Sequence, residues 1–275
     1  MLLQNKTAVI YGAGGSLGAA VAKAFSAAGA NLLLSGIHLE PVEATAGAIR
    51  QAGGKVQVDQ VDALDEKAVN DYLSSVYKQT GAIDISFCAI GLKDTQDIPL
   101  VEMKLEDFVR PIQIAMQSQF ITGTAAGRIM RGQKSGVILA LTATPGGIGY
   151  PGTGGFGVAC CAIESFTRNL ASELGPHGIR VVTIRSGGSP DSRVFVEAIA
   201  TLDKQTGEQI LGGLRNDSML KRLPAMHDIA NTAVFAASDL ATLITGTVID
   251  VTGGATTALN YKTTEERSSI PPFNT

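Results

Sequence analysis

The chain alternates short apolar runs, rich in β-branched residues, with longer segments whose apolar positions recur at helical spacing. Short runs of this kind predict strands, and the helical spacing predicts amphipathic helices. The expected strands are Thr7–Tyr11, Asn31–Ser35, Val56–Val61, Ile83–Ala89, Gly136–Leu141, Arg180–Ile184 and Thr247–Val251. The expected helices are Leu17–Ala28, Pro41–Ala52, Glu66–Thr80, Glu106–Gly132 with an interruption at Pro111, Phe156–Leu174, one or two looser helices within Ser192–Leu214, and His227–Ala237.

This order of elements predicts parallel βαβ units. We therefore expect an α/β fold with a Rossmann-type doubly wound parallel sheet in three α/β/α layers. The strands are apolar on both faces, as a sheet covered on both sides requires. No linker rich in Pro, Gly or Ser divides the chain, so residues 1–260 are expected to form a single domain. Residues 261–275 are polar and predict an extended tail.

Composition narrows the classes of function. The 275 residues are 45% apolar and 17% charged, with a formal net charge of −3, which is typical of a globular chain. No block of Lys and Arg indicates a nucleic-acid or membrane surface, so a small molecule is the expected partner. Three cysteines, Cys88, Cys160 and Cys161, form no disulfide framework, and we expect a reducing compartment, the cytoplasm. The three histidines show no metal-ligand spacing, so no metal site is expected.

A glycine-rich turn follows the first predicted strand and opens the first predicted helix. It contains Gly12, Gly14, Gly15, Ser16, Leu17 and Gly18. Glycines let the backbone approach a pyrophosphate closely, and a helix N-terminus offers free N–H groups and a positive dipole end. The turn therefore predicts a dinucleotide site, in which a side chain at Gly12 would stand where the phosphate must approach. The alternative is a tight strand–helix turn that binds nothing.

Several segments together resemble the short-chain dehydrogenase/reductase family. The spacing of Gly12, Ser16 and Gly18 is similar to its Gly-x-x-x-Gly-x-Gly turn, with Ser16 in place of the middle glycine. The similar stretches are Ile83–Gly91, Gly152–Arg168, Leu170–Val181 and Ile244–Gly254, so the resemblance extends over about Lys6 to Ala255. It implies a dinucleotide-binding domain and a homo-oligomer, a tetramer or dimer, built on Glu106–Gly132 and Phe156–Leu174.

The resemblance also implies which residues line a bound NAD or NADP. These positions are Gly12, Gly14, Gly15, Ser16, Leu17, Gly18, Ser35, Gly36, Asp62, Ala63, Ala89, Gly91, Ser186 and Gly187. Gly36 stands where NAD-binding members carry an acid, and this favours NADP slightly. His38 is a candidate phosphate partner or a surface residue. Asp62 is a candidate partner of the adenine or a helix N-cap.

The family's catalytic residues have no counterparts at the matching positions. The tyrosine that passes the proton falls on Phe156, its lysine helper on Cys160, the polarising serine on Ala143 and the relay asparagine on Ala115. Phe156 has no proton to give, so poor reduction of ordinary ketones is expected. Candidate substitutes are Thr142, Thr144, Tyr150 and a Cys160 thiolate; alternatively, Tyr150 lines the site and the three cysteines are small buried residues.

These observations leave three interpretations of function. The first is an NAD(P)-binding oxidoreductase, by resemblance, that lacks the usual proton-transfer tetrad. Its substrate should need no enzymic acid. An iminium ion and a strongly activated alkene are substrates of this kind. The second is a non-catalytic, nucleotide-dependent binding or regulatory protein. The third is an inactive subunit that pairs with an active relative.

Overall fold

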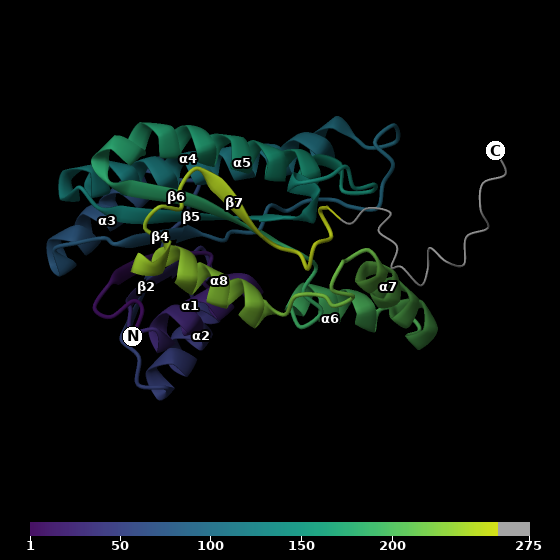
Figure 1. Ribbon diagram of the computed structural model, residues 1–275, viewed down its shortest axis with the longest axis horizontal. Helices are drawn as coiled ribbons and strands as arrows, with labels where there is room; N and C mark the ends of the chain where they lie inside the picture. The colour runs from purple at the N-terminus through teal and green to yellow at the C-terminus, as the bar shows by residue number, and fades with distance from the viewer. Residues whose placement is uncertain (258–275) are drawn as a thin grey trace.

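Seven parallel strands form one sheet in the computed structural model, in the order β3-β2-β1-β4-β5-β6-β7 (Figure 1). The structure describes residues 1–257, so the expected tail at 261–275 lies outside the described residues. The strands are β1 Thr7–Tyr11, β2 Asn31–Gly36, β3 Val56–Gln60, β4 Ile85–Cys88, β5 Gly136–Ala143, β6 Ile179–Ser186 and β7 Thr247–Val251. The doubly wound α/β fold expected from the sequence is confirmed.

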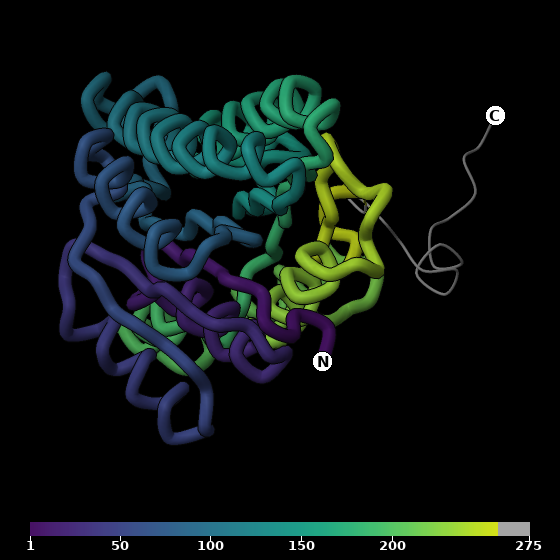
Figure 2. The backbone as a smooth tube through the Cα atoms, turned by 90° about the vertical axis from the view of Figure 1, so that its left-hand side faces the viewer, coloured from purple at the N-terminus to yellow at the C-terminus, as the bar shows by residue number. Residues whose placement is uncertain are grey.

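Helices cover both faces of the sheet. The helices are α1 Ser16–Ala27, α2 Leu39–Gln51, α3 Glu66–Thr80, α4 Leu105–Gln133, α5 Gly154–Leu174, α6 Arg193–Ala200, α7 Lys204–Asn216 and α8 Met226–Ala237, with short 3-10 turns η1 Thr144–Gly146, η2 Gly175–His177 and η3 Asp239–Ala241. Helices α1, α2 and α8 pack on one face, and α3, α4 and α5 pack on the other (Figures 1 and 2). Helices α6 and α7 stand beside one end of the sheet (Figure 1).

Burial explains why the central strands are apolar on both sides. Every residue of β1 is buried, because its two faces meet the two apolar cores. The expectation that all strands are apolar on both faces is wrong for β3 and β7 at the sheet edges. Three of the five residues of β3 are exposed, since an edge strand has a neighbour on one side only.

Pro111 does not interrupt the helix that contains it, contrary to the sequence expectation. Helix α4 runs unbroken from Leu105 to Gln133. A proline within a helix removes one backbone hydrogen bond and usually kinks it. Here Pro111 is buried beside Gly155 of α5. A Cβ added at Gly155 would lie 2.9 Å from the proline ring and clash with the Phe108 carbonyl. Tight packing against α5 stabilises the continuous helix.

The sheet order places a switch point between β1 and β4. From β1 the chain continues to β2 and β3 on one side, and from β4 to β5, β6 and β7 on the other. Ligands of open α/β sheets bind at this point, outside the carboxyl ends of the strands.

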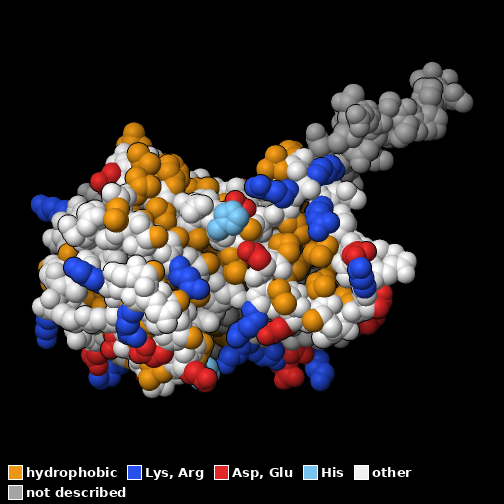
Figure 3. All heavy atoms as spheres, turned by 90° about the horizontal axis from the view of Figure 1, so that it is seen from below, with side chains coloured by type: hydrophobic (Ala, Val, Ile, Leu, Met, Phe, Trp, Pro, Cys, Tyr) orange, Lys and Arg blue, Asp and Glu red, His pale blue; other side chains and the backbone are white. Residues whose placement is uncertain are grey.

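On the face covered by α1, α2 and α8, acidic and basic side chains are interspersed with apolar ones (Figure 3).

Candidate dinucleotide and active site

The glycine turn lies at the switch point and is held there by its backbone. The N–H groups of Gly12 and Ala13 both donate to the Ser35 carbonyl, at 2.9 and 3.2 Å. Gly12 has a φ of +75°, and a Cβ added there would lie 2.6 Å from the Ala89 carbonyl oxygen. A side chain at Gly12 would therefore clash with the protein itself, and its effect on an approaching phosphate stays a prediction. Glycine is required at position 12 by its contact with the end of β4.

The N-terminus of α1 is open to an anion. Gly15 is the N-cap residue, in an extended conformation, and no side chain caps the helix. A Cβ added at Gly15 would meet only the Gly12 carbonyl oxygen, at 3.4 Å. The first-turn N–H groups of a helix have no partner within the helix, and they carry its positive dipole end. The turn thus fits a pyrophosphate.

Ser16 connects this turn to a segment that sequence reasoning did not associate with it. The Ser16 hydroxyl accepts a hydrogen bond from the backbone N–H of Arg193, at 3.1 Å. Arg193 is the first residue of α6, so the start of α6 lies directly against the start of α1. No local sequence signal indicates this contact, because the two residues are 177 positions apart.

The residues expected beside the adenosine lie at the end of β2 and after β3. Ser35 is buried, and His38 is the exposed N-cap residue of α2. Asp62 is exposed and accepts a hydrogen bond from the N–H of Leu64 at 2.9 Å, while Asp65 caps α3. The N-cap interpretation of Asp62 is therefore wrong: its carboxylate stabilises the turn before the helix. The buried Ala63 follows it.

The remaining positions expected to line the dinucleotide also reach the carboxyl edge of the sheet. Ala89 follows β4 and donates its N–H to the Tyr11 carbonyl at 3.0 Å, and Gly91 is exposed two residues later. Ser186 ends β6, and Gly187 donates its N–H to the Val251 carbonyl at 3.2 Å. The fold thus brings together residues at the ends of four strands, β1, β4, β6 and β7, that are far apart in the sequence.

Ala143 and Cys160 meet at the candidate active centre. Ala143 is the last residue of β5, and the Cys160 sulfur lies against its backbone. Burial is the main cause that raises the pKa of the Cys160 thiol to about 12, and the Glu164 and Asp94 carboxylates contribute. The thiol is therefore neutral at neutral pH. Phe156 lies one helical turn before it on α5 and is partly buried.

Ala115 packs among apolar side chains, and its carbonyl accepts a hydrogen bond from the buried Ser118 hydroxyl at 3.2 Å. It is fully buried on α4, in a small cluster with Ala140, Ala159 and Ile163, against which Leu92, Ile112 and Met116 pack. An alanine among these residues offers nothing that would hold a chain of waters.

Two of the three hydroxyls considered as substitutes have other partners. Thr142 is buried and donates to Glu164 Oε1 at 2.9 Å, and Thr144 donates to the Ser186 carbonyl at 3.5 Å. Burial, followed by the nearby Asp217 carboxylate, raises the pKa of the Tyr150 phenol. Tyr150 therefore stays protonated at neutral pH.

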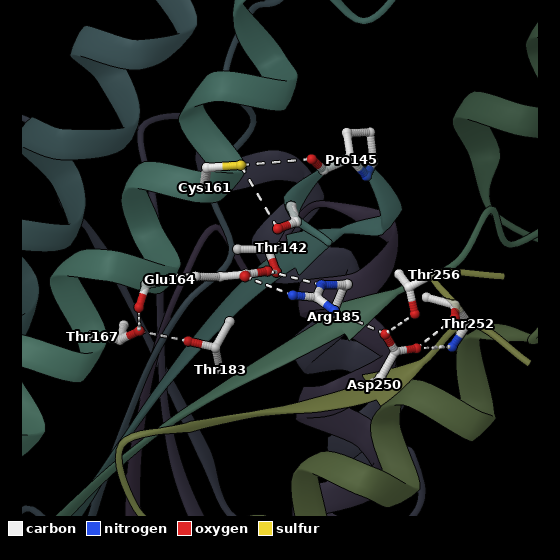
Figure 4. Close-up of polar contacts among 11 residues, drawn as sticks. Thr142, Pro145, Cys161, Glu164, Thr167, Thr183, Arg185, Asp250, Thr252 and Thr256 are labelled. Atoms are coloured by element: carbon white, nitrogen blue, oxygen red, sulfur yellow. Dashed lines mark hydrogen bonds and ion pairs between the residues drawn. The ribbon is translucent and has the colours of Figure 1, made fainter. Parts of the chain in front are cut away.

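Cys88 and Cys160 are buried, as expected, but the expectation of burial is wrong for Cys161. Cys161 is exposed, because it follows Cys160 on the helix and points away from the sheet. Its thiol donates to the Pro145 and Gly146 carbonyls, both at 3.7 Å (Figure 4). These contacts connect α5 to the turn η1.

A network of charges behind Cys160 was not predicted from the sequence. Arg185 on β6 binds Glu164 on α5 through Nε at 2.9 Å and Nη2 at 2.7 Å, and it binds Asp250 on β7 through Nη1 at 3.0 Å (Figure 4). Asp250 also accepts hydrogen bonds from Thr252 and Thr256. A signal was available in the sequence. Arg185 directly follows the predicted strand Arg180–Ile184, and Glu164 lies beside Ile163 in a predicted helix, and charges that become buried require partners.

Within residues 1–257, no group of three or more His, Cys, Asp or Glu side chains is placed to hold a metal ion. Among the same residues, no helix combines the length and the apolar character that a membrane span requires.

The chain was compared with known proteins. The family model described as enoyl-(acyl carrier protein) reductase matches residues 12–256. The chain is 29% identical over 252 residues to the uncharacterized oxidoreductase YxbG of Bacillus subtilis, covering 92% of this chain and 91% of that protein. It is 30% identical over 254 residues to the 3-oxoacyl-[acyl-carrier-protein] reductase FabG of Chlamydia trachomatis, covering 92% and 98%.

A solved structure supports the same assignment. The structure of levodione reductase superposes with a TM-score of 0.85 at 26% sequence identity, covering 93% of this chain and 99% of that one. The family match spans most of the chain, and the fold and the glycine turn agree with it. The chain therefore belongs to the short-chain dehydrogenase/reductase family of oxidoreductases.

Proposed function

We propose that this protein binds NAD(P) at the glycine turn and is an oxidoreductase that works without the usual proton-transfer tetrad of its family. The uncapped N-terminus of α1 supports the first part, because it lies at the switch point and presents free N–H groups to a pyrophosphate. Gly12, Gly15 and Ser16 would hold the pyrophosphate, and Ser35, Gly36 and Asp62 would face the adenosine. A bound dinucleotide would supply or accept a hydride.

The identity of four side chains carries the second part of the proposal. Ala115, Ala143, Phe156 and Cys160 occupy the positions of the asparagine, serine, tyrosine and lysine. The Cys160 thiol is the only one of these that titrates, and its pKa of about 12 keeps it protonated and uncharged. General acid–base catalysis is typically worth about 10²–10⁴-fold in rate. We therefore propose that ordinary ketones are poor substrates.

We propose a preference for NADP over NAD. No carboxylate occupies position 36 at the end of β2, where an acid would bind the ribose hydroxyls and repel a 2′-phosphate. His38 at the N-terminus of α2 adds a donor and the positive end of a helix beside that position. Competitive calorimetry with the two dinucleotides measures the preference directly, and tighter binding of NAD would contradict it.

We propose that α4 and α5 form the interface of a homo-oligomer, a tetramer or a dimer. Phe120 on α4 is 52% exposed and contacts Phe166 on α5, with ring centroids 6.2 Å apart. Val109 and Val158 on the same helices are also exposed. Exposed apolar side chains of adjacent helices are typical of an interface between subunits. A sedimentation mass equal to one chain at micromolar concentration would exclude this assembly.

The cytoplasmic location of the protein stays a prediction. The three cysteines are free thiols, and this supports a reducing compartment such as the cytoplasm.

The central experiment separates binding from turnover. Calorimetry with NADP and NAD tests the site, and NADPH oxidation with a panel of ketones and imines tests the activity. Binding together with slow or absent ketone turnover supports the proposal. Binding without turnover of any substrate class would favour a nucleotide-dependent regulatory protein, and co-purification with a relative that has the tetrad would favour an inactive subunit. No binding of either dinucleotide at millimolar concentration would exclude the proposed function.

A further inference from the structure

Helices α6 and α7 bury little of their own surface. Every residue of α6 has exposed surface, and so does every residue of α7 except the buried Gly207. Val194 and Val196 of α6 are 69% and 55% exposed, although both are apolar. Segments with few buried apolar contacts have low local stability and move most easily. The two helices, which stand beside one end of the sheet (Figure 1), are therefore able to change position while the core stays folded.

Polar contacts hold the start of α6. The Asp191 carboxylate accepts the Met226 N–H at 3.0 and 3.1 Å, which attaches the preceding segment to the start of α8. Two residues later, the Arg193 N–H donates to the Ser16 hydroxyl at 3.1 Å. The Arg193 guanidinium pairs with Glu197 of its own helix at 3.7 Å. The start of α6 is thus bound to the glycine turn through its backbone and the Ser16 side chain.

This closed position of α6 has a cost at Ser189. Ser189 is 5% exposed, and its hydroxyl has no hydrogen-bond partner within residues 1–257. A buried hydroxyl without a partner lowers the stability of the arrangement that buries it. The Phe195 ring of α6 lies against the neighbouring Gly188, where an added Cβ would be 2.7 Å from the ring. A shift of α6 away from this segment would let water reach Ser189, so the free-energy difference between the closed position and a more open one is reduced.

The Ser16 hydroxyl is able to hold α6 and a phosphate at the same time. A hydroxyl has one hydrogen to donate and two lone pairs that accept. The Ser16 oxygen accepts the Arg193 N–H, and its hydrogen donates to no group within residues 1–257. That hydrogen is available to an anion at the uncapped N-terminus of α1. Hydrogen bonds in such a chain strengthen one another, and a bond to a charged phosphate is the stronger kind. A bound pyrophosphate should therefore strengthen the attachment of α6.

We propose that Ser16 is a positioning residue through which a bound dinucleotide stabilises the closed position of α6. The proposal rests on the proposed binding of NAD(P) at the glycine turn and adds a coupling between that site and α6. Such a coupling is reciprocal, so the closed position should tighten dinucleotide binding by the same factor. Ser16 replaces the middle glycine of the family's turn, and a glycine has no hydroxyl, so this contact belongs to the present chain.

Hydrogen exchange on the full chain measures this coupling independently of turnover. In the unaltered chain, saturating NADP should slow exchange of the α6 backbone amides about fivefold, as expected for one added hydrogen bond. In Ser16→Ala the same amides should exchange faster without dinucleotide, and saturating NADP should no longer slow them. Calorimetry should show NADP binding to Ser16→Ala about fivefold more weakly. Ser16→Thr keeps a hydroxyl at this position and should preserve both the slowed exchange and the affinity.

Ser189→Ala is a matched variant with the opposite expected effect. It removes the buried hydroxyl that has no partner in the described part of the chain, and it leaves the Ser16–Arg193 contact in place. The closed position should become more stable, so the α6 amides should exchange more slowly than in the unaltered chain without dinucleotide. NADP should still slow their exchange, because Ser16 is unchanged.

The outcomes distinguish this coupling from the proposed function. Calorimetric binding of NADP to the unaltered chain without slower exchange in α6 would overturn the coupling and leave the dinucleotide site standing. Equal slowing by NADP in Ser16→Ala and in the unaltered chain would also overturn it, and so would faster exchange of α6 in Ser189→Ala. Absence of NADP binding to the unaltered chain would exclude the proposed function, and the coupling with it.

Discussion

Glu164 and Arg185 form a buried two-point ion pair that joins α5 to β6, with Nε–Oε1 and Nη2–Oε2 distances of 2.9 and 2.7 Å. The side chain of Glu164 is 6% exposed and that of Arg185 is 13% exposed. Thr142 donates a third hydrogen bond to the carboxylate from β5. The pair lies one helical turn beyond Cys160, so it fixes the part of α5 that forms the candidate active centre.

Arg185→Met should destabilise the protein by about 3–5 kcal/mol, because it leaves the buried Glu164 carboxylate without its cation. The double variant Glu164→Gln with Arg185→Met should cost less than the sum of the single changes, since it leaves no buried unpaired charge at position 164. Denaturant unfolding measures the free energy of unfolding of each variant. Asp71→Asn is the control, because it breaks the exposed Lys67–Asp71 pair and should cost less than about 1 kcal/mol. Equal costs for Arg185→Met and the control would show that the buried pair contributes little.

Acid should weaken the attachment of β7 and of the turn that follows it. Burial acts to raise the pKa of Asp250, but hydrogen bonds from Thr252, Thr256 and Arg185 outweigh burial and lower the pKa below its usual value. A carboxyl with a lowered pKa in the folded state stabilises that state above its unfolded pKa of about 3.9 and loses this contribution as the pH falls through the folded pKa. Thermal unfolding should therefore show a decline in stability below about pH 4 that is smaller in Asp250→Asn. An identical pH slope in the two proteins would contradict this assignment.

Thiol reactivity should divide the three cysteines. Burial raises the pKa of the Cys88 and Cys160 thiols, and both side chains are inaccessible, whereas Cys161 is exposed. Only the thiolate reacts, so a neutral alkylating reagent should modify Cys161 first in the native protein. Mass spectrometry of the digested protein locates the label, and unfolding in denaturant should make all three sites reactive. Early labelling of Cys160 would show that its environment is open and that its thiol is not held neutral.

Gly15→Asp should separate stability from dinucleotide binding. Gly15 has the extended conformation of an N-cap residue, and an added Cβ meets only one atom, so an aspartate can cap α1 and should maintain or slightly raise the melting temperature. Its charge would repel the pyrophosphate, and binding of NADP in calorimetry should fall at least about tenfold. Gly15→Asn is the matched control, with similar shape and no charge, and should retain most of the affinity. Unchanged binding in Gly15→Asp would place the phosphate elsewhere.

Restoration of the catalytic residues should create ketone reduction. Ala143→Ser, Phe156→Tyr and Cys160→Lys together supply the polariser, the acid and its helper, while single changes should do little because such residues act as a unit. The Glu164 carboxylate one turn along α5 offers the new lysine a partner, although Arg185 already binds it. NADPH oxidation with simple ketones compares the triple variant with the unaltered protein, and circular dichroism checks that the variant is folded. Robust ketone turnover by the unaltered protein would mean that another donor, such as Tyr150, does this work.

The sequence by itself predicted the elements and their order, because hydrophobic periodicity and turn residues act over a few neighbouring positions. It also predicted the glycine turn at the end of β1 from the spacing of its residues. The family resemblance assigned Ala143, Phe156 and Cys160 to the catalytic positions, and this assignment stays a prediction. The strand order, and with it the switch point between β1 and β4, came from the structure and not from the sequence.

Only the tertiary structure decided which distant residues meet. Arg185 contacts Glu164 and Asp250 from 21 and 65 positions away, and Arg193 reaches Ser16 across 177 positions. No local pattern encodes such contacts, because they depend on which strands are neighbours and on how closely the helices pack. The same packing keeps α4 continuous at Pro111 and exposes Cys161 beside the buried Cys160.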